Sequence, residues 1–204
     1  DTFDRNFAFS VEHVALAKQA DLVLLAPATA NLVGKIAGGI ADDMLTTTVM
    51  ACTCKILLPP AMNHNMYHNP IVQDNLQKLQ KFGYFLIPPT HGMLANGDLG
   101  DGKLPSEETL VEYVKREHAY EKDLQGKKIL VTAGATQEAI DPVRYITNHS
   151  TGKMWYSLAQ QAMLRGAQVT LVSGITSLEP PMFTEMVPVV SAEEMYQEVM
   201  ARAS

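Results

Sequence analysis

The chain has 204 residues, of which 47% are hydrophobic and 19% charged, an ordinary balance for one large globular domain or parts of two. Its net charge of −6 comes without a basic block or stripe, which argues against a nucleic-acid-binding protein. No apolar run approaches the roughly 20 residues needed to cross a bilayer, so no membrane partner is expected.

Helical and strand patterns alternate through the first half of the chain. Short, continuous apolar runs predict buried strands, and the longer segments between them predict helices. Asn69-Pro70 is a typical helix start, and Gly83 fits the left-handed position at the end of the same helix. The expected elements are a helix over 11–20, a strand over 22–26, a helix from 32 broken at 38–39 and resumed over 44–51, a strand over 55–58, a helix over 69–83 and a strand over 84–87.

Cys52 and Cys54 lie in an apolar stretch without a second Cys or His pair at metal-ligand spacing. They indicate two small buried side chains in a reducing cytoplasm.

Residues 88–105 show no apolar period and carry four glycines with Asp98 and Asp101 between them. A loop of this length is typical of a lid or binding flap. The acidic spacing does not match a calcium loop, and no Glu closes it. We therefore expect no metal ligands here.

A second run of alternating elements follows a charged segment. A helix is expected over 106–118, and the charged residues favour a linker over 121–127. Beyond it lie an expected strand over 128–133, a helix over 154–165, strands over 168–173 and 186–190 and a helix over 192–203. Strands alternating with helices in both halves predict an α/β protein with two parallel sheets. Neither a dinucleotide-binding glycine fingerprint nor a P-loop is present.

Two strand-to-helix turns are candidate binding sites, because open α/β sheets bind ligands where their strands end. Residues 27–31 offer small and polar groups at a helix start, although an ordinary helix cap is the favoured explanation of this segment taken alone. In the second turn, residues 59–67, Asn63 is placed to point at a ligand. A well-formed turn is about as good an explanation of that segment.

Six sequence blocks together resemble the bifunctional bacterial coenzyme A enzyme, phosphopantothenoylcysteine decarboxylase fused to phosphopantothenate–cysteine ligase. The combination in this order is specific, whereas each block alone is weak. The blocks are the segment around His13 (13–21), Pro27-Ala28-Thr29-Ala30-Asn31, the P-x-M-N-x-x-M-[WY] motif at 60–67, the flap at 94–103, and the ligase signatures at 134–138 and 141–154.

The resemblance implies a flavodoxin-like parallel-sheet flavoprotein domain over 1–120, followed by the start of a Rossmann-like ligase domain over 128–204. It implies FMN-dependent decarboxylation of 4'-phosphopantothenoylcysteine to 4'-phosphopantetheine in the cytoplasm. The upstream flavin-phosphate region and the ligase's lysine-rich loop have no counterpart here, so the chain is expected to be a fragment.

The resemblance also implies residue roles. His13 and Asn63 are the expected catalytic residues, and an imidazole can accept or hold a proton near neutral pH. The neutral amide of Asn63 can hold a carboxylate without stabilising it by full charge. A hydrogen-bonded structural histidine remains the alternative for His13, and a core position the alternative for Met66. Cofactor binding is expected at Pro27, Ala28, Thr29 and Asn31, and substrate binding at Asn63, Met66, Ala95 and Lys103.

In the ligase half, Arg144 and Asn148 resemble positions that handle the nucleotide and the acyl phosphate. An arginine can hold phosphate oxygens bidentately. CTP and Mg²⁺ are the implied ligands there. A homotrimer or dodecamer is the implied assembly, with His13 and Asn63 coming from neighbouring chains.

The flap departs from the family at Asn96, where the family has a proton-donating cysteine. A thiol can release a proton near neutral pH and an amide cannot. We therefore expect oxidation and decarboxylation to proceed but to stall at the enethiolate. Two alternatives remain. One is a non-catalytic regulatory homologue, which Asn96 favours and the retained His13 and Asn63 disfavour. The other is a flavin peptidyl-cysteine decarboxylase, which the ligase signature disfavours.

Overall fold

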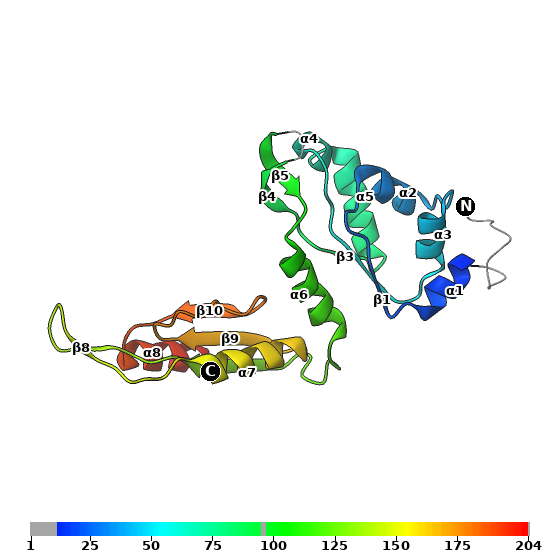
Figure 1. Cartoon of the computed structure of the whole chain (residues 1–204). Coiled ribbons are helices and arrows are strands. Elements are labelled where there is room, and N and C mark those ends of the chain that lie inside the picture. Colours follow the sequence, from blue (N-terminus) through cyan, green and yellow to red (C-terminus); the bar gives the residue numbers. More distant parts are fainter. Residues whose placement is uncertain (1–11, 95–96, 204) are drawn as a thin grey trace. The chain divides into compact units, whose positions relative to one another are not determined.

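The computed structural model describes residues 12–94 and 97–203, and the chain divides into two compact units, Asp1–Val114 and Lys115–Ser204 (Figure 1). The first unit contains the helices α1 (Glu12–Gln19), α2 (Ala30–Gly38), α3 (Met44–Ala51), α4 (His64–Tyr67) and α5 (Pro70–Lys81), with the strands β1 (Leu22–Leu24), β2 (Lys55–Leu58), β3 (Phe85–Leu86), β4 (Thr90–Met93) and β5 (Leu99–Lys103). Helix α6 (Glu107–His118) runs across the division between the units.

A parallel sheet in the order β1-β2-β3 forms the centre of the first unit. Leu57 and Leu58 of β2 are fully buried and, being consecutive in a strand, point to opposite faces. Leu58 joins a core with α2, α3 and α5, whereas Leu57 packs with Ile87 and with Leu110 of α6. Both faces of the central strand are therefore covered, as the continuous apolar run predicts.

Local signals set several helix ends as the sequence predicts. Asn69 caps α5 by accepting a hydrogen bond from Ile71 N at 2.9 Å, and Pro70 occupies the first turn. Gly83, just beyond α5, has a φ of +92°. The β1 strand is shorter than expected: it ends at Leu24, and the chain bends at Ala26 and Pro27.

The prediction of a loop over 88–105 is in part wrong, because about half of this segment pairs as the antiparallel hairpin β4–β5. Its strands contain Gly92, Gly100 and Gly102, which mask any alternating pattern. Gly102 has a φ of +108°, and a Cβ there would overlap the carbonyl oxygen of Met62. The glycine thus permits a close approach between the hairpin and the segment after β2.

The second unit is a parallel sheet in the order β10-β9-β6, with α7 packed on β6 and β9. Its buried residues include Tyr156, Ala159 and Leu171. Residues 121–127 pack onto this unit, since Leu124 N donates to Arg165 O at 3.1 Å and Asp123 pairs with Arg165. Its elements are β6 (Lys128–Ala133), β7 (Glu138–Ala139), β8 (Tyr145–Ile146), α7 (Lys153–Leu164), β9 (Gln168–Ser173), β10 (Glu185–Pro188) and α8 (Ala192–Arg202).

A small antiparallel hairpin, β7–β8, was not expected from the sequence and protrudes from one end of the second unit's sheet (Figure 1). In the described part of the chain, no helix has both the length and the apolar character needed to cross a membrane.

Candidate functional site

The two strand-to-helix turns lie side by side at the carboxyl end of the first sheet. Ala28 N donates to Pro59 O at 2.9 Å, and Ala61 N donates to Ala28 O at 3.1 Å. Ala28 and Pro60 therefore form a parallel bridge that extends the β1–β2 pairing beyond the strands. The chain thus brings the 27–31 and 60–67 segments together, although they are some 30 residues apart.

The first turn exposes polar groups at the start of α2. Thr29 caps the helix, its Oγ1 accepting from Leu32 N at 3.3 Å. Pro27, Thr29 and Asn31 are exposed, whereas Ala28 is fully buried. The first turn of a helix has backbone N–H groups without helical partners, which attract anionic or polar ligand groups.

Asn63 is held in place by its own amide oxygen. Its Oδ1 accepts from Asn65 N at 2.9 Å, which makes Asn63 the cap of α4. Because a backbone N–H must face an acceptor, this bond fixes which end of the amide carries the NH₂ group. The Asn63 side chain thus presents a neutral donor from a half-buried position.

The flap hairpin is attached directly beside Asn63. Met62 N donates to Gly102 O at 3.0 Å, which ties β5 to the segment after β2. Lys103, the last residue of β5, is exposed, and Met66 of α4 is 48% exposed. Ala95 and Asn96 lie outside the described residues.

His13 lies apart from this group. It is half-buried in α1, and Figure 1 shows α1 at the opposite end of the first unit from α4 and the flap. Among the described residues, its Nδ1 is buried without a hydrogen-bond partner. A buried polar atom left unpaired is costly, so this nitrogen calls for a partner beyond the described contacts.

The predicted ligase residues lie in and after the exposed β7–β8 hairpin. Arg144 Nε donates to Asp141 Oδ2 at 2.6 Å, and Arg144 N donates to Asp141 Oδ1 at 2.7 Å. Hydrogen bonds from the Arg144 and Val143 backbone and from the Arg144 guanidinium lower the pKa of Asp141. Asn148 Oδ1 accepts from Ser150 N at 2.8 Å, a local turn that leaves the residue exposed.

The chain matches two protein families in succession. Residues 2–119 match the family described as Flavoprotein. Residues 124–204 match the family described as DNA/pantothenate metabolism flavoprotein C-terminal domain.

Curated relatives are alike over nearly the whole chain. The coenzyme A biosynthesis bifunctional protein CoaBC of Bacillus subtilis is 47% identical over 204 residues, covering 98% of this chain and 50% of the relative. The Vibrio vulnificus protein of the same name is 50% identical over 195 residues, covering 96% and 48%. The chain thus spans about half the length of these relatives.

Two solved structures support the fold of the first unit. One is a mutant PPC decarboxylase complexed with pantothenoylaminoethenethiol, with a TM-score of 0.55, 34% identity and coverage of 59% of this chain and 66% of that chain. The other is the FMN-binding protein AtHal3, with a TM-score of 0.51, 34% identity and coverage of 58% and 64%. The fold of the first unit is flavodoxin-like, as the family resemblance implies. With both halves matched in order, the chain belongs to the family of bifunctional coenzyme A biosynthesis flavoproteins, CoaBC.

Proposed function

We propose that the first unit carries out the FMN-dependent decarboxylation of 4'-phosphopantothenoylcysteine. The observation that carries this proposal is the convergence of three segments at one end of the sheet: the 27–31 turn, the 60–67 turn and the flap strand β5. The similarity to the solved structure of a PPC decarboxylase supports this class of substrate.

Pro27, Thr29 and Asn31 would hold FMN. They are exposed at the start of α2, where hydroxyl, amide and backbone N–H groups suit the polar parts of a flavin nucleotide. Ala28 is buried, so its contribution is to join the two turns and not to touch the cofactor with its side chain. When bound, FMN supplies the two-electron oxidation of the thiol-bearing carbon, and loss of CO₂ follows from the oxidised substrate.

Asn63 would bind the substrate carboxylate. Its oxygen is engaged by Asn65 N, so the NH₂ end is the part available to a carboxylate. A neutral donor orients that group while giving it less ground-state stabilisation than a cation would. Met66 and Ala95 would line the substrate site, and the exposed ammonium of Lys103 would face the substrate's anionic groups.

His13 would accept or hold a substrate proton. The unpaired, buried Nδ1 supports a role that needs a further partner. Because α1 and α4 lie at opposite ends of the unit, a site that uses both His13 and Asn63 needs two chains. A homo-oligomer, trimer or dodecamer, with sites between cytoplasmic subunits meets that need.

Asn96 would interrupt the final protonation, because an amide does not release a proton near neutral pH. The test is to mix the protein with FMN and substrate and to follow flavin absorbance and CO₂. We expect one bleaching event and one equivalent of CO₂ per site, and continuous turnover in Asn96→Cys. A wild-type chain that turns over steadily would contradict the stall.

The same experiment separates the alternatives. A regulatory homologue, which Asn96 favours, would release no CO₂ and would gain nothing from Asn96→Cys. A peptidyl-cysteine decarboxylase would act on a peptide with a C-terminal cysteine instead of the phosphopantothenoyl substrate.

The second unit would contribute Arg144 and Asn148 to a CTP- and Mg²⁺-dependent phosphopantothenate–cysteine ligase in the whole protein. The ion pair with Asp141 uses Nε, one of several N–H groups of the Arg144 guanidinium, and orients the others. Loss of CTP binding in Arg144→Ala, with Arg116→Ala unchanged, would support the assignment. Equal CTP binding by both variants would contradict it.

A further inference from the structure

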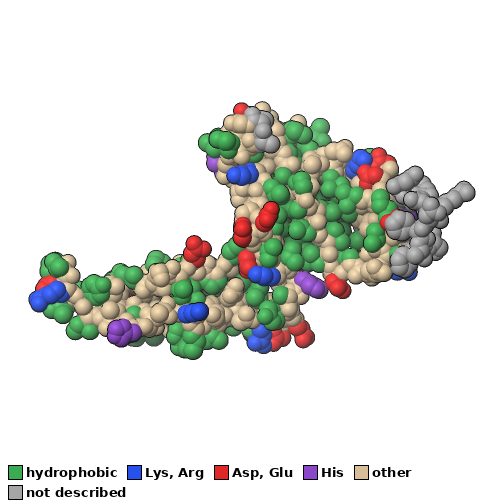
Figure 2. Space-filling view, viewed as in Figure 1, with side chains coloured by type: hydrophobic (Ala, Val, Ile, Leu, Met, Phe, Trp, Pro, Cys, Tyr) green, Lys and Arg blue, Asp and Glu red, His purple; other side chains and the backbone are tan. Residues whose placement is uncertain are grey.

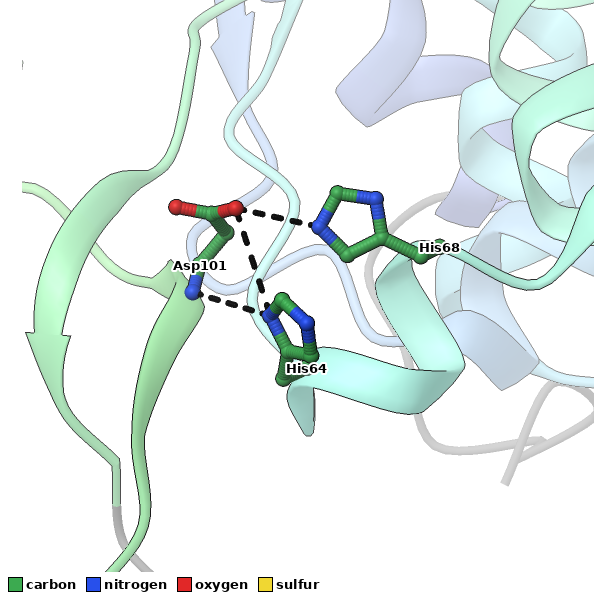
Figure 3. Close-up of side chains that lie close together, drawn as sticks. All are labelled: His64, His68 and Asp101. Atoms are coloured by element: carbon green, nitrogen blue, oxygen red, sulfur yellow. Dashed lines mark hydrogen bonds and ion pairs between the residues drawn. The ribbon is translucent and has the colours of Figure 1, made fainter.

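Helix α4 and the flap hairpin gather histidines around one carboxylate (Figure 3). His64 and His68 lie four residues apart, on one side of α4 and its cap, with ring centroids 4.4 Å apart. Asp101 Oδ2 of β5 lies 3.0 Å from His68 Nε2 and 4.0 Å from His64 Nδ1. Residues more than 30 positions apart in the sequence thus converge on a single oxygen.

The backbone around Asp101 holds this geometry. On one side of it, a Cβ at Gly100 would lie 2.9 Å from His64 Nδ1; on the other, Gly102 O accepts from Met62 N. Asp101 N donates to His64 Nδ1 at 3.2 Å. The lone pair of His64 therefore lies on Nδ1, where it faces Asp101, and a metal ion bound to this nitrogen would take the place of the Asp101 N–H group.

His91 of β4 holds the other oxygen of the same carboxylate. Its Nδ1 lies 2.9 Å from Asp101 Oδ1, which leaves Oδ2 on the side of His64 and His68. His91 thus orients the Asp101 carboxylate from behind, as outer hydrogen-bond partners orient metal-ligating carboxylates. The contact between His68 Nε2 and Asp101 Oδ2 is a hydrogen bond in the metal-free chain, and an ion bound between the two atoms would take the place of its proton.

We propose that His64 Nδ1, His68 Nε2 and Asp101 Oδ2 bind a divalent transition-metal ion of the Zn²⁺ class, with His91 positioning Asp101. The ligand atoms of these three residues all lie within 4.8 Å of one another. Zinc bonds of about 2.0–2.2 Å place tetrahedral ligand atoms about 3.3 Å apart, so small movements of these side chains are enough to bind the ion. Two imidazoles with one carboxylate favour Zn²⁺, Co²⁺ or Ni²⁺ over Ca²⁺ or Mg²⁺.

Three protein ligands leave the fourth position to water. The ion would bridge α4, which begins next to Asn63, and β5 of the flap. It would thereby fix the hairpin against the 60–67 turn, with no part in the decarboxylation chemistry itself. This proposal departs from the expectation that the flap holds no metal ligands, because the spacing of its acidic residues does not reveal the histidines that the fold brings beside Asp101.

The test is titration of the whole chain with Zn²⁺ by calorimetry and with Co²⁺ by its visible absorption. We expect one saturable site per chain, weakened at least about 10-fold in His68→Ala and in Asp101→Asn. Both residues are substantially exposed, and the asparagine is nearly isosteric, so both variants should fold. His118→Ala is the matched control and should bind as the unchanged chain does.

A second readout is hydrogen exchange over 90–103, which Zn²⁺ should slow in the unchanged chain and in His118→Ala but not in Asp101→Asn. Absence of saturable binding by the unchanged chain overturns the proposal. So does equal binding in His68→Ala and Asp101→Asn, or binding that disappears only when Cys52 and Cys54 are both replaced by serine.

Discussion

At the scale of single residues, Asn63 combines a structural and a functional duty in one side chain. Its oxygen caps α4, and its NH₂ group is the proposed carboxylate donor. The two duties can be separated, because aspartate caps a helix as well as asparagine does but cannot donate from an ionised carboxylate.

Asn63→Asp should therefore leave the free energy of unfolding within about 0.5 kcal/mol of the unchanged chain. The rate of flavin bleaching by substrate should fall by about 100-fold or more, through loss of the donor and repulsion of the substrate carboxylate. Asn69→Asp is the control, since Asn69 caps α5 by the same kind of bond. Equal bleaching rates in the two variants would refute the role of Asn63.

Asp43 should make α3 sensitive to acid. Hydrogen bonds from Thr46 N, from Lys35 and from the Thr46 hydroxyl lower the pKa of Asp43 from 3.8 to about 2. A carboxyl group whose pKa is lower in the folded state stabilises the fold above its unfolded pKa, and this contribution is lost as the pH falls from 3.8 toward 2.

The urea midpoint of the unchanged chain should therefore drop more steeply over that pH range than the midpoint of Asp43→Asn. Asp42→Asn is the control, because Asp42 also pairs with Lys35 but does not cap α3. If Asp43→Asn shows the same acid slope as the unchanged chain, the cap does not carry this sensitivity.

At the scale of elements, the flap depends on one close backbone contact. Gly102 combines a positive φ with a position where a Cβ would overlap Met62 O, whereas Gly83 has a positive φ but open space around it. Alanine substitutions at Gly83 and Gly102 therefore separate the cost of a left-handed backbone conformation from the cost of a steric overlap.

Gly83→Ala should cost about 1–2 kcal/mol of unfolding free energy, the cost of a left-handed alanine. Gly102→Ala should cost about 1–3 kcal/mol more, because the hairpin must move away from Met62. Hydrogen exchange at Met62 N, which donates to Gly102 O, should accelerate only in Gly102→Ala. Unchanged exchange there would show that the contact does not hold the flap.

Elements with a strong local signal could be predicted, and those made by pairing could not. The buried run at β2 and the Asn69-Pro70 start of α5 identified their elements directly. The β4–β5 and β7–β8 hairpins lack alternating apolar residues, so only their partners in space reveal them. The same holds for the candidate site. Sequence motifs identified Thr29 and Asn63, whereas the cluster of His64, His68 and Asp101 is formed by the fold and has no motif of its own.

At the scale of the whole molecule, the proposed decarboxylase site joins His13 of one chain to Asn63 of another. In the described part of the first unit, apolar side chains are widely exposed on the visible face in Figure 2. Several large ones are about half exposed or more, among them Ile40, Leu45, Met50, Ile71 and Phe82. Burial of such groups between subunits would stabilise an oligomer.

Co-expression of His13→Ala with Asn63→Asp in equal amounts tests whether the site is shared between chains. Each variant alone should bind FMN but fail to bleach it with substrate. Mixed oligomers should recover about a quarter of the wild-type bleaching amplitude, since about one site in four pairs an intact His13 with an intact Asn63. Mixed oligomers that bind FMN yet show no bleaching, beside an active wild-type chain, would contradict a site shared between chains.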